Sequence, residues 1–150
     1  MSPKSAADPF DQLVDAVAGG IGHRATWGQR QHRGRAVRRG FDERRFRKAL
    51  RAYWGPAADT MRVSLAVQDA SFVAGVVQTV SETLQLDEAE RRRAAAAMVR
   101  NRVLAEPDPT FAAVDRAWRA WWPPPPGDDG RRLFTAFVDA WRNWLTDGSR

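Results

Sequence analysis

Apolar side chains recur every three or four residues along most of the chain, the spacing that places them on one face of an α-helix. The clearest stripe is formed by Phe46, Leu50, Tyr53 and Trp54. We therefore expect an all-α fold, a single-domain bundle of about six or seven helices with a basic loop after the first helix. The predicted helices cover residues 9–18, 42–54, 57–68, 71–84, 87–105, 108–122 and 130–146.

Helix start and stop signals lie between these stripes. Asp8-Pro9 and Asp108-Pro109 each place a capping residue before a proline suited to the first helical position. Asp87 and Glu90 have the spacing of a capping box. Gly19-Gly20 predicts the end of the first helix, and Asp129 is a candidate N-cap for the last one. The predicted domain spans 1–150, with a flexible tail (1–7), a basic loop or weak helix (22–40) and a Pro-rich linker (123–129).

The stretch over residues 57–86 fits more than one structure. Met61, Val63, Leu65 and Val67 alternate with other residues, which is a strand signal. Between residues 72 and 84 the apolar positions follow the helical period instead. We expect two helices, with a break near residues 69–71, and a hairpin is the alternative.

Residues 69–84, DASFVAGVVQTVSETL, contain the blocks AGV at 74–76 and TVS at 79–81. These blocks resemble the helix-turn-helix of bacterial repressors. One residue is missing between the blocks, and Val77 replaces the usual helix-capping Ser. A shift of one residue rotates a helix by about 100°. The resemblance implies a DNA-reading repressor, whereas the alternative is one continuous core helix.

The composition excludes several classes of protein. There is no Cys, so disulfides, thiolate metal sites and Cys nucleophiles are excluded. The first ten residues lack the apolar run of a signal peptide, and no stretch of eighteen apolar residues occurs. We expect a cytoplasmic protein without a membrane partner.

Basic residues are concentrated in one segment. Residues 22–51 hold eleven of the twenty-four Lys and Arg residues and only two acids, a net charge of +9, whereas the rest of the chain has thirteen basic and sixteen acidic residues. Such a concentrated field attracts polyanions, of which nucleic acid is the commonest. The predicted nucleic-acid-binding residues are Arg24, Trp27, Arg30, Arg33, Arg35, Arg38, Arg39, Arg44, Arg45, Arg47, Lys48 and Arg51.

Each of these features also has a structural interpretation. The charge run could be a solvated helix face beside a soluble loop, and Trp27 could anchor the loop to the core rather than stack on a base. A second, smaller cationic surface is predicted within residues 87–105. Its members are Arg91, Arg92, Arg93, Arg100 and Arg102.

We expect no catalytic site, no cofactor and no metal. His23 and His32 are the only histidines, and they lie in a Gly- and Arg-rich segment without further ligands. No Ser or carboxylate constellation accompanies them, and no phosphate-binding Gly loop with a Lys is present. These observations argue against an enzyme.

The Trp-rich end of the chain suggests a protein partner. Most of these Trp residues have core spacing, but Trp121 and Trp122 are adjacent and cannot both face one core, so they are candidates for partner binding. The leading hypothesis is a non-catalytic nucleic-acid-binding subunit of a nucleoprotein complex. In size and charge the chain resembles the small helical subunits of CRISPR ribonucleoprotein complexes. The alternative is a helical adaptor or regulator that docks on an acidic protein.

Overall fold

The computed structural model describes residues 8–22 and 41–148, and within these ranges it contains helices and no strand. The predicted all-α class is therefore confirmed. The α-helices are α1 (Pro9–Gly22), α3 (Glu43–Trp54), α4 (Thr60–Leu84), α5 (Glu88–Met98), α6 (Ala112–Trp121) and α7 (Gly127–Gly148). The shorter elements are two 3₁₀ turns, η2 (Gly55–Ala57) and η4 (Pro109–Phe111), and a π-helical segment, η3 (Val99–Val103).

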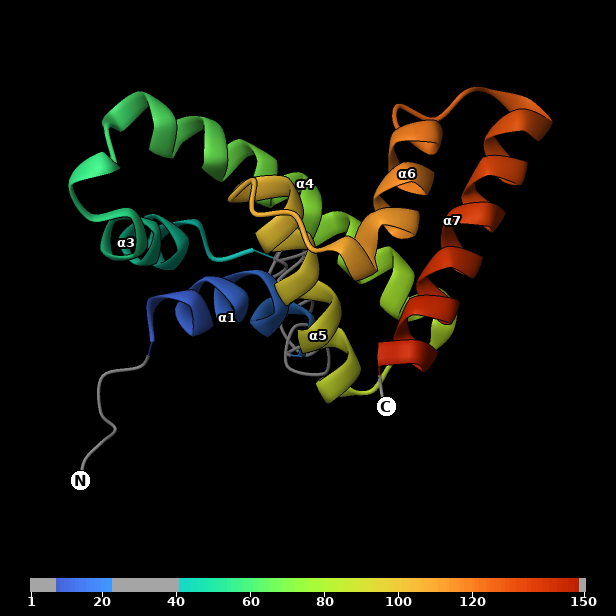
Figure 1. Cartoon of the computed structure of the whole chain (residues 1–150), viewed down its shortest axis with the longest axis horizontal. Coiled ribbons are helices and arrows are strands. Elements are labelled where there is room, and N and C mark those ends of the chain that lie inside the picture. Colours follow the sequence, from blue (N-terminus) through green and yellow to red (C-terminus); the bar gives the residue numbers. More distant parts are fainter. Residues whose placement is uncertain (1–7, 23–40, 149–150) are drawn as a thin grey trace, which may run out of the picture.

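The long helix α4 joins two ends of the molecule (Figure 1). At one end α1 and α3 lie side by side and antiparallel. The amide of Asp42 donates to the carbonyl of Ala16 over 3.0 Å, and the rings of Phe10 and Tyr53 lie 6.3 Å apart. At the other end α6 and α7 form a hairpin, and α5 crosses the middle of the molecule.

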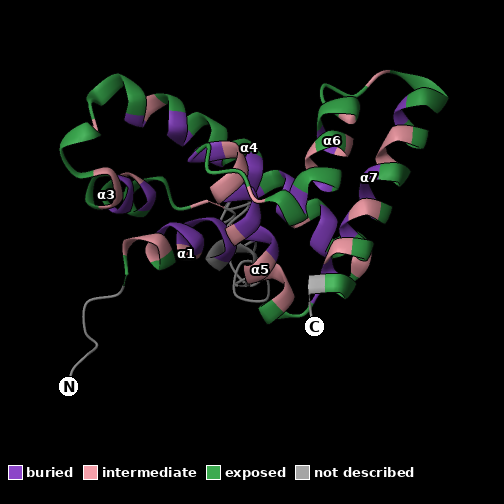
Figure 2. Cartoon of the chain, in the orientation of Figure 1, coloured by how far each residue is buried: buried purple, intermediate pink, exposed green. Residues whose placement is uncertain are grey.

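One cluster of buried side chains stabilises this arrangement, and every α-helix contributes buried residues to it (Figure 2). Aliphatic residues and one phenylalanine fill the space between α1, α3, α4 and α5, including the fully buried Leu13, Phe46 and Met98. Aromatic residues fill the space beside α6 and α7, where the ring of Trp141 lies 5.1 Å from that of Phe111. Burial of large aromatic side chains supplies much of the hydrophobic stabilisation of a small domain.

The predicted break near residues 69–71 and the alternative of a hairpin over residues 57–86 are both wrong. Helix α4 runs without interruption for 25 residues, with the side chain of Asp59 accepting from the amide of Arg62 over 2.8 Å at its N-terminus. The alternation arises because this helix has apolar residues on two sides. Val63 and Val67 face the core, whereas Met61 and Leu65 are exposed.

The continuous α4 also settles the resemblance to a helix-turn-helix. That motif needs a turn between its two helices, and α4 has none between residues 69 and 84. The segment is therefore part of one long helix, and the repressor interpretation loses the motif on which it rested.

Helix α4 is long and apolar enough, by length and composition, to cross a membrane. The prediction that no segment qualifies is therefore too strict on these criteria. Half of its most apolar window is buried inside the fold, where these residues pack within the helical bundle.

Several helix ends differ from the prediction, and three of these differences have a plain structural description. Helix α1 continues past Gly19-Gly20 to Gly22, because glycine within a helix costs only about 1 kcal/mol and does not forbid it. The helix over 87–105 changes to π-helical geometry at residue 99. Helix α7 begins at Gly127, so Asp129 lies in its first turn and is not its cap.

Candidate nucleic-acid interface

Helix α3 is positioned by its cap and its apolar stripe. The side chain of Asp42 accepts from the amide of Arg45 over 3.1 Å, which satisfies one free donor at the helix start. Phe46 and Leu50 are fully buried, as predicted from their spacing. The opposite side of the helix must therefore face solvent, and this side is where the basic residues lie.

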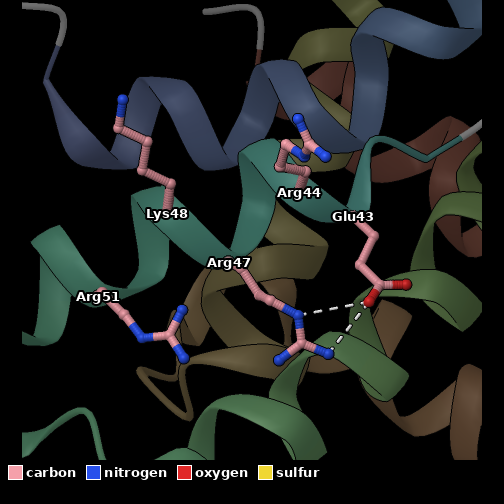
Figure 3. Close-up of a pocket in the computed structure, with 5 residues that line it drawn as sticks. All are labelled: Glu43, Arg44, Arg47, Lys48 and Arg51. Atoms are coloured by element: carbon pink, nitrogen blue, oxygen red, sulfur yellow. Dashed lines mark hydrogen bonds and ion pairs between the residues drawn. The ribbon is translucent and has the colours of Figure 1, made fainter.

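Four basic side chains on this exposed side form what we call the cationic face, namely Arg44, Arg47, Lys48 and Arg51. Together with Glu43 they line an open hollow of about 610 Å³. Along this face Arg44 and Lys48 lean toward one edge, and Arg47 and Arg51 lean toward the other (Figure 3). The spacing of three and four residues makes them neighbours on the helix surface.

Two basic residues of α3 have partners. The guanidinium of Arg47 donates to Glu43 over 3.1 and 3.3 Å at the rim of the hollow. Arg45 projects toward α1, where it donates to Gln12 over 2.9 Å and to Asp15 over 3.1 Å. Arg45 therefore holds α3 against α1. By contrast, Arg44, Lys48 and Arg51 have no side-chain partner within residues 8–22 and 41–148.

The predicted second cationic surface on α5 and η3 has a different environment, because every one of its arginines has a partner. Arg92 forms an ion pair with Asp15 of α1, and Arg91 donates to the carbonyl of Leu86 over 3.0 Å. Arg102 forms an ion pair with Asp115 of α6 over 3.3 Å. Arg92 and Arg102 therefore connect neighbouring helices, whereas Arg91 contacts the loop before α5.

The two other arginines of this second cationic surface, Arg93 and Arg100, contact aromatic rings. The guanidinium of Arg100 lies 4.1 Å from the ring centre of Phe10, and that of Arg93 lies 5.1 Å from the ring centre of Trp144. Cation–π contacts of this kind stabilise by about 0.5–1 kcal/mol at exposed sites. The α5 and η3 arginines thus serve the packing of the fold.

Most basic side chains in the described ranges have a partner, and those without one are few. The described ranges contain sixteen Lys and Arg residues. Twelve of them form a hydrogen bond, an ion pair or a ring contact. The four without such a contact inside these ranges are Arg44, Lys48, Arg51 and Arg116. Three of these four lie on the cationic face.

The other predicted nucleic-acid-binding residues lie outside the described residues. This applies to Arg24, Trp27, Arg30, Arg33, Arg35, Arg38 and Arg39. They belong to the segment that joins α1 to α3, so the chain itself connects them to the start of the cationic face.

The two candidate partner-binding tryptophans have different environments. Trp121 is half-buried, and its ring stacks 5.3 Å from that of Phe137. Trp122 is 39% exposed, and its ring lies parallel to that of Trp118 at 5.5 Å. Trp122 is therefore the more accessible of the two, and its role in partner binding stays a prediction.

One polar contact near α3 had no sequence signal. The hydroxyl of Tyr53 donates to both carboxylate oxygens of Glu106, over 2.8 and 3.0 Å. This hydrogen bond, followed by burial and the charge of Glu106, raises the pKa of Tyr53 above its ordinary value of 10.0. The partners lie 53 residues apart, so no local pattern could reveal them.

A larger hollow of about 890 Å³ lies beside α7. It is lined mainly by η4, α6 and α7, and its basic residue Arg93 already contacts Trp144. Asp139 on its rim is paired with Arg142 over 2.8 Å. The charges of Arg93 and Asp139 in this hollow are thus engaged within the fold, unlike those of Arg44, Lys48 and Arg51.

Within the part of the chain that the structure describes, no group of three or more His, Asp or Glu residues could hold a metal ion. His23 and His32 lie outside that part. Comparison with protein-family models, curated proteins and solved structures gives no match to this chain.

Proposed function

We propose that this chain binds the phosphate backbone of nucleic acid through the cationic face of α3. One observation carries the proposal. Three of the four basic side chains without a partner in the described ranges lie together on this face. Like charges three or four residues apart destabilise a helix by about 0.2–0.5 kcal/mol per pair. Arrangement of these charges on one face therefore favours binding of a polyanion over a purely structural role.

The dimensions of the face suit a phosphate backbone. Residues 44 to 51 cover a rise of about 10 Å at about 1.5 Å per residue. Phosphates follow one strand of a duplex at about 3.4 Å along its axis, so the face matches about three of them. Arg44 and Arg51 supply planar guanidinium groups that donate two parallel hydrogen bonds to phosphate, and Lys48 supplies a point charge.

The preceding arginines, Arg24, Arg30, Arg33, Arg35, Arg38 and Arg39, extend this interface in the proposal, because they precede α3 directly in the chain. In this proposal the chain is a non-catalytic, cytoplasmic subunit of a nucleoprotein complex. Phosphate contacts fix position without reading sequence, so binding should be largely independent of base sequence.

Fluorescence anisotropy tests the proposal. Labelled single-stranded RNA, single-stranded DNA and duplex DNA of equal length are titrated with the chain across a series of salt concentrations. We expect binding to at least one polymer, with the logarithm of the affinity falling by about 0.7–0.9 per phosphate contact for each tenfold rise in salt. No binding to any of the three at low salt would contradict the proposal. An acidic protein would then be the partner to seek.

A further inference from the structure

The first half of α4 carries an exposed apolar stripe on the side away from the core. Met61 is 73% exposed, Leu65 is 57% exposed and Phe72 is 58% exposed. Their spacings of four and seven residues place them on one face of the helix. Contiguous exposed apolar residues rimmed by polar ones mark interaction surfaces in folded proteins. The stripe is independent of the cationic face and of its proposed function.

The stripe continues into the aromatic residues of α6. The ring of Phe72 lies 5.9 Å from that of Trp122, which is itself partly exposed. Gln68 occupies the position between Leu65 and Phe72 on the same side of α4 and is also exposed. Apart from Gln68, the apolar surface therefore extends from Met61 near the start of α4 to Trp122, the residue that follows α6.

Two opposite charges flank the stripe on one side. Arg62 and Asp69 are both exposed and lie seven residues apart, so they share one edge of the helix face. In an antiparallel pair of identical helices, residues on the same edge of the two helices face each other. A pairing centred near Ala66 places Arg62 of each copy opposite Asp69 of the other, and places Met61 near Phe72.

The local contacts of Arg62 are compatible with such a pair. Its guanidinium lies 3.7 Å from the ring centre of Trp54 and donates to the carbonyl of Ala57 over 3.2 Å. A guanidinium has five N–H donors in its plane, so a stacked arginine keeps donors for a carboxylate. Asp69 has no side-chain partner in the described part of the chain, which makes it available to a second copy.

We propose that the stripe of Met61, Leu65 and Phe72 binds the same stripe of a second copy of this chain, forming an antiparallel dimer with two-fold symmetry. A two-fold interface brings the same patch of both copies together, so that residue i contacts residue j and residue j contacts residue i. Two sets of residues allow such reciprocal contacts. Met61 of each copy lies near Phe72 of the other, and Arg62 of each copy lies opposite Asp69 of the other.

The association state in solution tests the apolar part. Sedimentation velocity is measured over a range of concentrations for the wild type, for Leu65→Glu and for Thr83→Glu. Thr83 is exposed on the same helix, but it lies outside the proposed pairing. We expect a wild-type dimer, a dissociation constant at least about tenfold higher for Leu65→Glu and little change for Thr83→Glu. A wild type that stays monomeric at every concentration would overturn the proposal. A Leu65→Glu dimer as stable as the wild type would do the same.

A charge exchange tests the pairing of Arg62 with Asp69. Alone, Arg62→Glu places four acids at the interface and Asp69→Arg places four arginines there, so each variant should dimerise at least about tenfold more weakly. Mixed in equal amounts, the two variants place a glutamate opposite an arginine and an aspartate opposite an arginine. We expect native mass spectrometry to detect a heterodimer of the two variants. Mixing two misfolded variants could not restore dimer formation in this way. If the mixture forms no heterodimer, the proposed antiparallel pairing is wrong.

Discussion

The basic residues of α3 and those of α5 and η3 have similar sequence patterns but different surroundings in the fold. Arg92, Arg93 and Arg102 each reach an acid, a carbonyl or an aromatic ring of another helix. Arg44, Lys48 and Arg51 have no such contact in the described ranges, and they lie together around one hollow. A run of arginines therefore becomes a candidate binding surface only where acids and rings of the fold do not reach it.

Among the predicted changes in stability, the largest should follow from replacing Asp15, which contacts a basic residue of α3 and one of α5. Asp15 accepts from Arg45 of α3 and forms an ion pair with Arg92 of α5. We expect Asp15→Ala to lower the free energy of unfolding by about 0.5–2 kcal/mol, because two guanidinium groups, each more than a third exposed, lose their shared partner together. Urea denaturation measures the difference. The control is Asp11→Ala on the same helix, which removes an equal charge and should change stability by less than about 0.5 kcal/mol. Equal effects of the two variants would contradict the role of Asp15.

A smaller effect is expected at the end of α3, where Tyr53 donates to Glu106. Tyr53→Phe should lower the free energy of unfolding by about 0.5–1 kcal/mol near neutral pH, since solvent screens this partly exposed hydrogen bond. The raised pKa of Tyr53 means that the fold favours the protonated phenol. The stabilisation is therefore complete below the ordinary pKa and disappears as the pH rises through the raised pKa. Urea denaturation of both proteins over a series of rising alkaline pH values, from about pH 8 upward, tests this, because the difference between them should shrink as Tyr53 ionises. A difference that stays constant across the series would show that the phenol proton is not its source.

The smallest predicted change in stability is a gain rather than a loss, and it should follow from replacing Lys48. Lys48 has Arg44 four residues before it and Arg51 three residues after it, so Lys48→Gln relieves two like-charge pairs. We expect the free energy of unfolding to rise by about 0.2–0.5 kcal/mol at low salt, and the gain to disappear at high salt. Thermal denaturation of Lys48→Gln beside Arg92→Gln compares the two groups directly. If Lys48→Gln lost as much stability as Arg92→Gln, Lys48 would stabilise the fold as Arg92 does, and the prediction would be contradicted.

The sequence predicts α3 well because its determinants are local. Asp42 caps the helix, and Phe46 and Leu50 are buried at the expected spacing. The basic residues on the opposite side are then exposed by geometry alone. Their freedom from partners could not be predicted, because the acids that engage other arginines come from distant positions. Asp15 and Arg92, for example, lie 77 residues apart.

Helix α4 shows where the reasoning from pattern is wrong. Alternation of Met61, Val63, Leu65 and Val67 is a strand signal when one side of the segment faces water and the other faces the core. In the structure the same residues form a helix with an apolar face on each side, one buried and one exposed. Periodicity alone does not distinguish these cases, since Met61 and Leu65 occupy exposed positions of the helix where polar residues are usual.

The salt dependence of nucleic-acid binding for two charge-matched variants tests most directly whether the cationic face is a binding surface. One variant carries Arg44→Gln, Lys48→Gln and Arg51→Gln, and the other carries Arg116→Gln, Arg131→Gln and Arg132→Gln on α6 and α7. Each loses three positive charges. We expect the slope of log affinity against log salt to become shallower by about 2–3 in the first variant and to change by less than about 1 in the second. Equal changes in both would show that only the net charge of the chain matters and would contradict a specific role for the cationic face.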